Sequence, residues 1–204
     1  MNTWLLHRGA KPCLLLALCA PVAYLVWAAV ADQLGANPAE ALIRSTGDWT
    51  LRLLCLTLLI TPLRVITGWT GLARIRRMVG VSTFCYGLLH LAAYSWLDMG
   101  MEIADIVADI VKRPFILVGF AGMVLLTALA ATSFNRAIKA MGARRWQALH
   151  RSVYAIAVFA ILHFFWMRAG KNNFAEVAVY AAILSALLGW RARNFWIKRT
   201  AGAR

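Results

Sequence analysis

Three histidines are the residues in this chain best suited to chemistry, and each lies in or beside a long apolar stretch. His90 and His163 lie deep inside such stretches, whereas His150 opens the segment HRSVYAIAVFAILH, which ends at His163. A neutral imidazole is a strong metal ligand and can also accept or donate a proton. Ionisable side chains are costly in apolar surroundings, so histidines in these places are candidate functional residues.

The positions of His90 and His163 predict that their two rings lie at nearly the same depth, in the outer half of the bilayer. His90 lies about 18 Å along a helix that starts near Met78, and His163 lies about 19 Å beyond His150. Two imidazoles at one depth on different helices can bind a flat metal cofactor, and haem iron takes such axial ligands. No C-x-x-C-H motif is present, so the haem would be noncovalent, that is, b-type. The alternative is that each ring only hydrogen-bonds to a neighbouring helix.

A flat cofactor between two helices needs small residues one turn from each ligand. Gly87, Ala93 and Ala160 take these places. Aromatic side chains that could pack against its edge are nearby: Phe84, Tyr86, Tyr94, Phe159, Phe164 and Trp166. Both features are also common in membrane bundles that hold no cofactor.

His150 is a different case, because helical phase separates it from His163. At 100° per residue, the two side chains lie about 140° apart on a straight helix. The matching place on the preceding stretch is taken by Arg76 and Arg77 rather than by another histidine. His150 is therefore a candidate ligand for a weaker second haem, a part of a quinone or flavin site, or only an anchor of its helix.

Two arginines complete the set of candidate cofactor-binding residues. Arg52 lies inside an apolar stretch, where its guanidinium could pair with haem propionates or simply reach the lipid headgroups. Arg77 lies at the start of the stretch that carries His90, on the same side of the bundle as His150.

Six apolar stretches must position these residues, and each is near the length needed to cross a bilayer. They cover residues 12–31, 49–66, 78–96, 115–134, 152–167 and 174–190. Of the 204 residues, 62% are apolar, against about 45–50% in soluble globular chains. The sequence therefore predicts an all-α, polytopic membrane bundle of six transmembrane helices, forming one integral-membrane domain over residues 1–204.

The positive charge is unevenly distributed, and the net charge is +14. Sixteen of the 22 lysines and arginines lie in the N-terminal segment, the 64–77 and 136–151 loops and the tail from Arg191. All eight acidic residues lie on or near the other side. By the positive-inside rule, both termini are cytoplasmic. Topology and anionic membrane lipid then explain the basic surface, so no nucleic-acid partner is expected.

One loop on the outer side has a helical pattern of its own. In MEIADIVADIVKRP the apolar residues 103, 106, 107, 110 and 111 recur at helical spacing, and Pro114 ends the pattern. This predicts an interfacial helix over 102–111. It is either a simple connector or an acidic surface, built on Glu102, Asp105 and Asp109, on which a partner docks.

Three further segments are distinctive: LLITPLR (58–64), RRMVGVSTFCYGLLHLAAY (76–94) and RWQALHRSVYAIAVFAILHFFW (145–166). They resemble the MsrQ (YedZ) family, the haem-binding membrane subunits of bacterial periplasmic methionine sulfoxide reductase systems. This family is part of the ferric-reductase-like transmembrane group, which implies a haem core over about 45–167. The resemblance also implies that His90, His150 and His163 are the family histidines, with haem b between the third and fifth helices. Relatives with two stacked haems carry two histidines on each of these helices, and this chain has one on the third.

The resemblance implies electron transfer across the bacterial inner membrane, with FMN as a second cofactor. Quinol electrons would pass to a soluble periplasmic subunit that contains molybdopterin and reduces methionine sulfoxide in oxidised proteins. This chain would then be the electron-transfer subunit rather than the catalytic one. The alternative is a ferric or oxygen reductase; since the tail from Arg191 is too short for a nucleotide-binding domain, a separate cytoplasmic flavin reductase would feed it. A cofactor-free scaffold and a transporter are further alternatives.

Overall fold

The computed structural model describes residues 7, 9–169, 172 and 174–201, and every regular element in that part of the chain is helical. The elements are α2 (Ala10–Val30), α3 (Pro38–Thr67), α4 (Leu72–Ala93), the π-helix η1 (Tyr94–Asp98), α5 (Ile103–Lys112), α6 (Pro114–Ala131), α7 (Asn135–Met141), α8 (Ala143–His150), α9 (Val153–Ala169) and α10 (Ala175–Ala201). Six helical segments among them are long and apolar enough to cross a membrane. The all-α, six-span prediction is confirmed.

Two spans are longer than the sequence indicated. α3 begins at Pro38, far before residue 49, because Asn37 caps it and proline suits the first helical position. The Asn37 side-chain oxygen accepts a hydrogen bond from the Glu40 backbone N–H at 3.1 Å. α10 continues past Trp190 to Ala201, because lysine and arginine are good helix formers even where the apolar run has ended.

The fifth span is divided at its basic end. α8 ends at His150 and α9 begins at Val153, with a turn between them. His150 and His163 therefore do not lie on one straight helix, and the angle expected from helical phase does not apply. The position of His150 depends on α8 and on the elements that α8 contacts.

α3 is the most buried span and joins two hydrophobic clusters. In its most apolar window 39% of the residues are buried, against 17–22% in the other five spans. One cluster links α3 to α6, α9 and α10 and includes Leu58, Leu126 and Ile156. The other links α3 to α2 and α4 and includes Leu18 and Val79. The remaining helices are thus arranged around α3.

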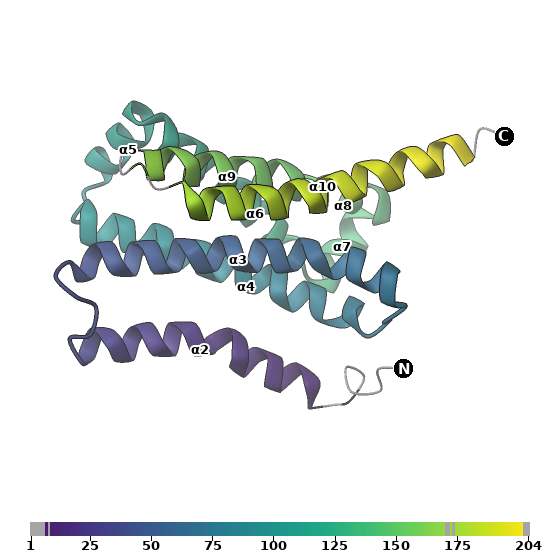
Figure 1. The fold of residues 1–204 in the computed structure, drawn as a ribbon, viewed down its shortest axis with the longest axis horizontal. Coiled ribbons are helices and arrows are strands. Elements are labelled where there is room, and N and C mark those ends of the chain that lie inside the picture. The colour runs from purple at the N-terminus through teal and green to yellow at the C-terminus, as the bar shows by residue number, and fades with distance from the viewer. Residues whose placement is uncertain (1–6, 8, 170–171, 173, 202–204) are drawn as a thin grey trace.

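The two ends of the bundle differ. α2 begins and α10 ends at the same end, and the short helices α7 and α8 lie there too (Figure 1). α5 lies at the opposite end (Figure 1). The basic segments of α7, α8 and late α10 therefore share one end of the molecule. The start of α2 and the end of α10 lie at this end too, because the number of spans is even.

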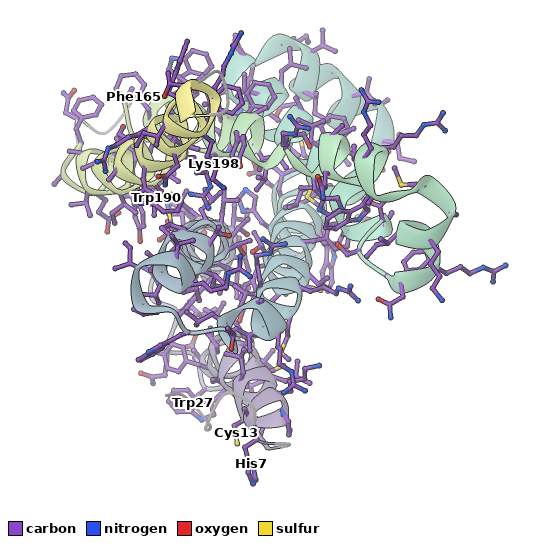
Figure 2. The ribbon with its side chains drawn as sticks, turned by 90° about the vertical axis from the view of Figure 1, so that its right-hand side faces the viewer. His7, Cys13, Trp27, Phe165, Trp190 and Lys198 are labelled. Carbon is purple, nitrogen blue, oxygen red and sulfur yellow. The ribbon has the colours of Figure 1, made fainter. Side chains whose placement is uncertain are left out.

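Apolar side chains cover the outside of the bundle. Val30 is 85% exposed and Leu16 is 72% exposed. Seen from one end, Trp27 lies at one edge of the molecule and Phe165 near the opposite edge (Figure 2). A continuous apolar outer surface of this kind marks contact with lipid rather than with water.

Candidate functional site

α4 and α9 bring His90 and His163 together inside the bundle. Their ring centres are 6.2 Å apart, and their ring planes are inclined at 78°. Both helices run away from the basic end of the molecule, so residues at similar distances from the helix starts reach the same level. The two rings lie at the same level, as their depths in the sequence predicted.

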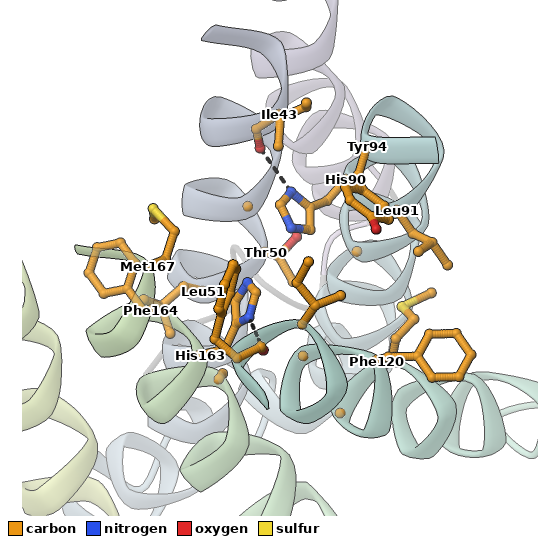
Figure 3. A pocket seen from close by; sticks show the side chains of 18 of the residues that line it. Ile43, Thr50, Leu51, His90, Leu91, Tyr94, Phe120, His163, Phe164 and Met167 are labelled. Carbon is orange, nitrogen blue, oxygen red and sulfur yellow. Dashed lines mark hydrogen bonds between the residues drawn. The ribbon is translucent and has the colours of Figure 1, made fainter. Parts of the chain in front are cut away.

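Each of the two rings is held by a backbone carbonyl of another helix. His90 Nδ1 lies 2.8 Å from the carbonyl oxygen of Ile43 in α3, and His163 Nδ1 lies 2.6 Å from that of Phe115 in α6. A carbonyl oxygen only accepts, so each Nδ1 donates and each Nε2 keeps its lone pair. Each Nδ1 is turned away from the other ring (Figure 3). Metal-binding histidines are commonly oriented by such a bond.

The separation of the rings fits two imidazoles on opposite sides of one metal ion. With a metal–nitrogen bond of about 2.0–2.1 Å, the centres of two such rings lie about 6.4 Å apart. The observed separation is 6.2 Å. Two side chains do not complete the coordination of a bare ion, but a haem iron brings its porphyrin nitrogens and needs only axial ligands. The donor set and its spacing therefore fit a haem.

The two histidines line a cavity of about 300 Å³ between α3, α4, α6 and α9 (Figure 3). Apolar side chains form most of its lining, including Leu51, Leu126 and Ile156. Toward the end that carries α5 the lining becomes polar, with Arg44, Asp48, Tyr94, Asp98 and Arg113. An apolar interior with a polar rim suits a flat, amphipathic cofactor.

Two glycines that the sequence analysis missed leave room for the histidine rings. A Cβ atom at Gly119 in α6 would lie 2.7 Å from His163 Nδ1. A Cβ atom at Gly47 in α3 would lie 3.1 Å from His90 Nδ1. Glycine inside a helix costs about 1 kcal/mol relative to alanine, so a glycine there can signal a close approach. That signal was present in the sequence, but it does not say which helix approaches.

The small and aromatic residues expected around the ligands fall into two groups. Four of them line the cavity: Gly87, Tyr94, Ala160 and Phe164. Five do not: Phe84, Tyr86, Ala93, Phe159 and Trp166. Tyr86 has another role, because its hydroxyl donates to the Leu18 carbonyl at 2.8 Å and holds α2 against α4.

Arg52 lies away from this cavity. Its Nε donates to the Tyr180 hydroxyl in α10 at 3.1 Å, and its guanidinium lies 5.0 Å from the centre of the Trp49 ring. The arginines at the cavity rim are instead Arg44 and Arg113. Both lie outside the apolar stretches, so their place at the cavity was not predictable from the sequence.

A polar contact at the rim fixes α5 to the bundle. The Tyr94 hydroxyl donates to Asp109 Oδ2 at 2.7 Å, and Arg113 Nε lies 2.8 Å from Asp109 Oδ1. The Asp109 side chain is only 12% exposed. The helix predicted over 102–111 is confirmed, but one of its three acidic residues faces the bundle and is not part of an outer acidic surface.

His150 and Arg77 belong to a second cavity, at the basic end. His150 Nε2 lies 3.1 Å from the Thr132 hydroxyl oxygen, while that hydroxyl donates to the Ala128 carbonyl at 2.8 Å. In this arrangement Nε2 is the donor, whereas the paired histidines donate from Nδ1. The Trp146 ring stacks on His150 with its centre 4.0 Å away. The structure thus gives His150 different surroundings from those of the other two histidines.

Comparisons with known proteins agree with this architecture. Residues 46–161 match the family model described as ferric reductase like transmembrane component. Three relatives carry the name protein-methionine-sulfoxide reductase heme-binding subunit MsrQ. The one from Polaromonas naphthalenivorans is 65% identical over 96% of this chain and 89% of its own length. Those from Ralstonia nicotianae and Bordetella pertussis are 53% and 49% identical, over 95% and 94% of this chain and 88% and 92% of theirs.

The chain belongs to the MsrQ family. As a member of the MsrQ family with six apolar helices, it is a multi-pass membrane protein, and the bacterial inner membrane fits the family. The region matched by the family model includes His90 and His150, and His163 follows directly after it. No solved structure matches the chain.

We predict that Asp109→Ala loosens α5. The change removes the acceptor of both the Tyr94 hydroxyl and the Arg113 guanidinium, and hydrogen bonds to charged groups contribute about 1.5–3 kcal/mol. Amide hydrogen exchange over residues 103–112 should become about tenfold faster or more, since tenfold corresponds to about 1.4 kcal/mol. Asp105→Ala on the same helix is the control and should leave the exchange nearly unchanged. Equal exchange in the two variants would contradict the prediction.

Proposed function

We propose that this chain is a membrane b-type cytochrome that passes quinol electrons across the inner membrane to a periplasmic, molybdopterin-dependent methionine sulfoxide reductase subunit. The observation that carries the proposal is the pair of imidazoles 6.2 Å apart, each with its Nδ1 committed to a carbonyl oxygen. The names of the relatives, heme-binding subunits of a protein-methionine-sulfoxide reductase, support both the cofactor and the reaction. The chain is then the electron-transfer subunit, and catalysis takes place on the partner.

His90 and His163 would hold haem b as its axial ligands. The bonds to Ile43 and Phe115 fix both rings and keep Nε2 available for iron. Haem, when bound, supplies a one-electron couple whose potential depends on its axial ligands and surroundings. At the cavity rim, Arg44 and Arg113 are placed to pair with propionates, a role for which the sequence had indicated Arg52. The haem core is proposed to extend over residues of about 45–167.

The distribution of charge supports the proposed direction of transfer. With the basic end in the cytoplasm, both termini are cytoplasmic and the end with α5 faces the periplasm. Reduction of methionine sulfoxide consumes two electrons and two protons and releases methionine and water. A quinol supplies two electrons and two protons, so donor and acceptor balance. Glu102 and Asp105, both exposed on or beside α5, are then available to a docking partner.

A second redox cofactor would lie between the quinol and the paired histidines. The resemblance to the MsrQ family favours FMN in this role, and His150 and Arg77 are the candidate residues at the basic end. The sequence left three roles open for His150. Its hydrogen bond to Thr132 and its stacking on Trp146 favour a residue that lines a cofactor site over one that binds iron.

The alternative function is a ferric or oxygen reductase fed by a separate cytoplasmic flavin reductase. The match to the ferric reductase like family model supports this reading. Both readings use the same histidine pair and differ in the final acceptor.

The first test concerns haem ligation. We predict that His90→Ala and His163→Ala each lose the main low-spin haem, because each removes one axial ligand, whereas His150→Ala retains most of it. The measurement is the Soret absorbance together with haem quantitation on purified protein. If His150→Ala loses the haem completely while His90→Ala keeps it, the pairing is wrong, and a colourless wild type would exclude a haem protein altogether.

The second test concerns the space around His163. We predict that Gly119→Ala lowers haem retention at least tenfold, because its Cβ atom would lie 2.7 Å from Nδ1 and displace the ring from Phe115. Gly189→Ala in α10 is the control, since its Cβ atom would have no neighbour within 4 Å and the residue does not line the cavity. Haem loss of the same size in both variants would show that the effect does not come from the space around His163.

The third test separates the two functions. Protein reconstituted in vesicles and reduced with a quinol should be reoxidised on adding a molybdopterin-dependent sulfoxide reductase subunit together with a methionine sulfoxide peptide. The visible haem band gives the rate, and omission of the peptide is the control. Reoxidation at the same rate by a ferric chelate or by oxygen alone would favour the alternative.

A further inference from the structure

α5 is a short helix with little burial against the rest of the molecule. It has ten residues, and within this helix, all of which the structure describes, only Ile110 is buried. α5 packs against α6, and Asp109 joins it to Tyr94 of η1. Helices shorter than about 12–15 residues are marginal in water on their own, so α5 depends on its surroundings for its stability.

The side chains of α5 form three faces, because successive residues project about 100° apart. The face toward the bundle carries residues that are at least partly buried: Ile106, Asp109 and Ile110. A polar face carries the exposed Asp105 and Lys112. The third face is a row of exposed aliphatic residues at every fourth position, which we call the apolar edge: Ile103, Val107 and Val111. It points about 110° away from the bundle face and about 150° away from the polar face.

The apolar edge is strongly exposed, since Ile103 is 76%, Val107 54% and Val111 71% exposed. Its surroundings are apolar as well. Trp96 of η1 and Leu117 in the first turn of α6 are large exposed side chains on the two elements that α5 contacts. Tryptophan is enriched where membranes meet water. The edge therefore continues the apolar outer surface of the spans, which contacts lipid.

The arrangement of the three faces distinguishes lipid from a soluble partner. An amphipathic helix at a membrane surface places its apolar side among the acyl chains and its polar side in water. α5 lies at one end of the spans (Figure 1), where such a surface is met. A soluble protein that contacts Asp105 approaches from the side opposite the apolar edge, so it leaves that edge uncovered. The occupant that fits the edge is the outer lipid leaflet.

The bundle face of α5 closes one end of the histidine cavity. Ile110 of α5 lines this cavity, and so does Arg113, which follows the helix directly. Tyr94 also lines it, and its hydroxyl donates to Asp109. A movement of α5 away from the bundle would therefore remove part of the polar rim and open the cavity at this end.

The chain bends on both sides of α5. Before the helix, Gly100 and Met101 have φ angles of 58° and 65°. After it, Arg113 has an extended backbone, with φ −107° and ψ 104°, and Pro114 begins α6. Segments that open and close commonly move about a few residues at the ends of elements. α5 is thus a compact unit between two bends.

We propose that α5 is a lid over the histidine cavity and that the acyl chains of the outer lipid leaflet hold it closed through the apolar edge. The lipid contact supplies the second apolar surface that the small bundle face lacks, and the polar face stays in water. The inference rests on the proposed function in two respects, namely the placement of α5 on the outer side of the membrane and the use of haem retention as a measurement.

The first experiment tests the lipid contact on the wild-type chain. The protein is placed in nanodiscs of phosphatidylcholine that carries a diazirine in its acyl chain, and mass spectrometry locates the adducts after illumination. Adducts are expected on the apolar edge and not on Asp105, whereas a water-soluble diazirine should label the polar face. Leu117 is the internal control, because it is an exposed residue of a span. Labelling of Leu117 without any lipid adduct over residues 103–112 would overturn the proposal.

The second experiment compares Val107→Asn with Asp105→Asn in the same nanodiscs. Valine, aspartate and asparagine have similar helix propensities, so the two variants differ mainly in the face that is changed. Amide hydrogen exchange over residues 103–112 should become at least tenfold faster in Val107→Asn and change less than twofold in Asp105→Asn. Transfer of haem to apomyoglobin should become at least threefold faster in Val107→Asn only, because the lid opens more often.

Two further results would overturn the proposal. Equal exchange in the two variants, measured without any soluble protein present, would assign the apolar edge to a protein partner. Faster exchange in Val107→Asn with unchanged haem transfer would show that α5 is not a lid. The Soret band is read in the same samples. Its absence from the wild type defeats the proposed function, whereas the lipid adducts and the exchange rates still decide whether lipid holds α5.

Discussion

The donation of two imidazole protons to backbone carbonyls is the constraint around which this bundle is arranged. His90 comes from α4 and is held by α3, and His163 comes from α9 and is held by α6. Four helices must therefore approach closely at one level, and each must present a carbonyl or a ring there. In an apolar interior an imidazole N–H without a partner is costly, so these two bonds fix the rotation of the helices as well as the rings.

The helices can approach the histidine rings closely at this level because two residues there are glycines, which have no Cβ atom. Gly119 and Gly47 each lie against the ring that their own helix holds, where even one carbon atom would crowd the ring. The same helices provide five of the seven leucines of the larger hydrophobic cluster. Glycine near the ring and leucine in the cluster allow α3 and α6 to serve both as ring supports and as core helices.

Much of this arrangement was predictable from the sequence, because bilayer thickness and helical rise impose simple rules. Apolar length identified six spans, and the number of residues before each histidine predicted that His90 and His163 lie at one level. Features that depend on packing were not predictable. Nothing local indicates that Gly119 in α6 faces His163, and Arg52 turns to Tyr180 because α10 happens to lie there. The turn between α8 and α9 carries no glycine or proline signal, so the sequence did not indicate that the helix is interrupted directly after His150.

The layer between the two cavities has a consequence for how charge crosses the membrane. Leu54, Thr83 and Leu126 line both cavities, so a single layer of side chains separates them. The Thr83 hydroxyl donates to the Val79 carbonyl of its own helix at 2.9 Å and lies 3.3 Å from the Thr57 hydroxyl. An electron that crosses this layer toward the end with α5 moves negative charge outward through the field of the membrane. A full crossing corresponds to about 2.3 kcal/mol per 100 mV, so in an inside-negative cell the membrane potential itself would drive outward transfer.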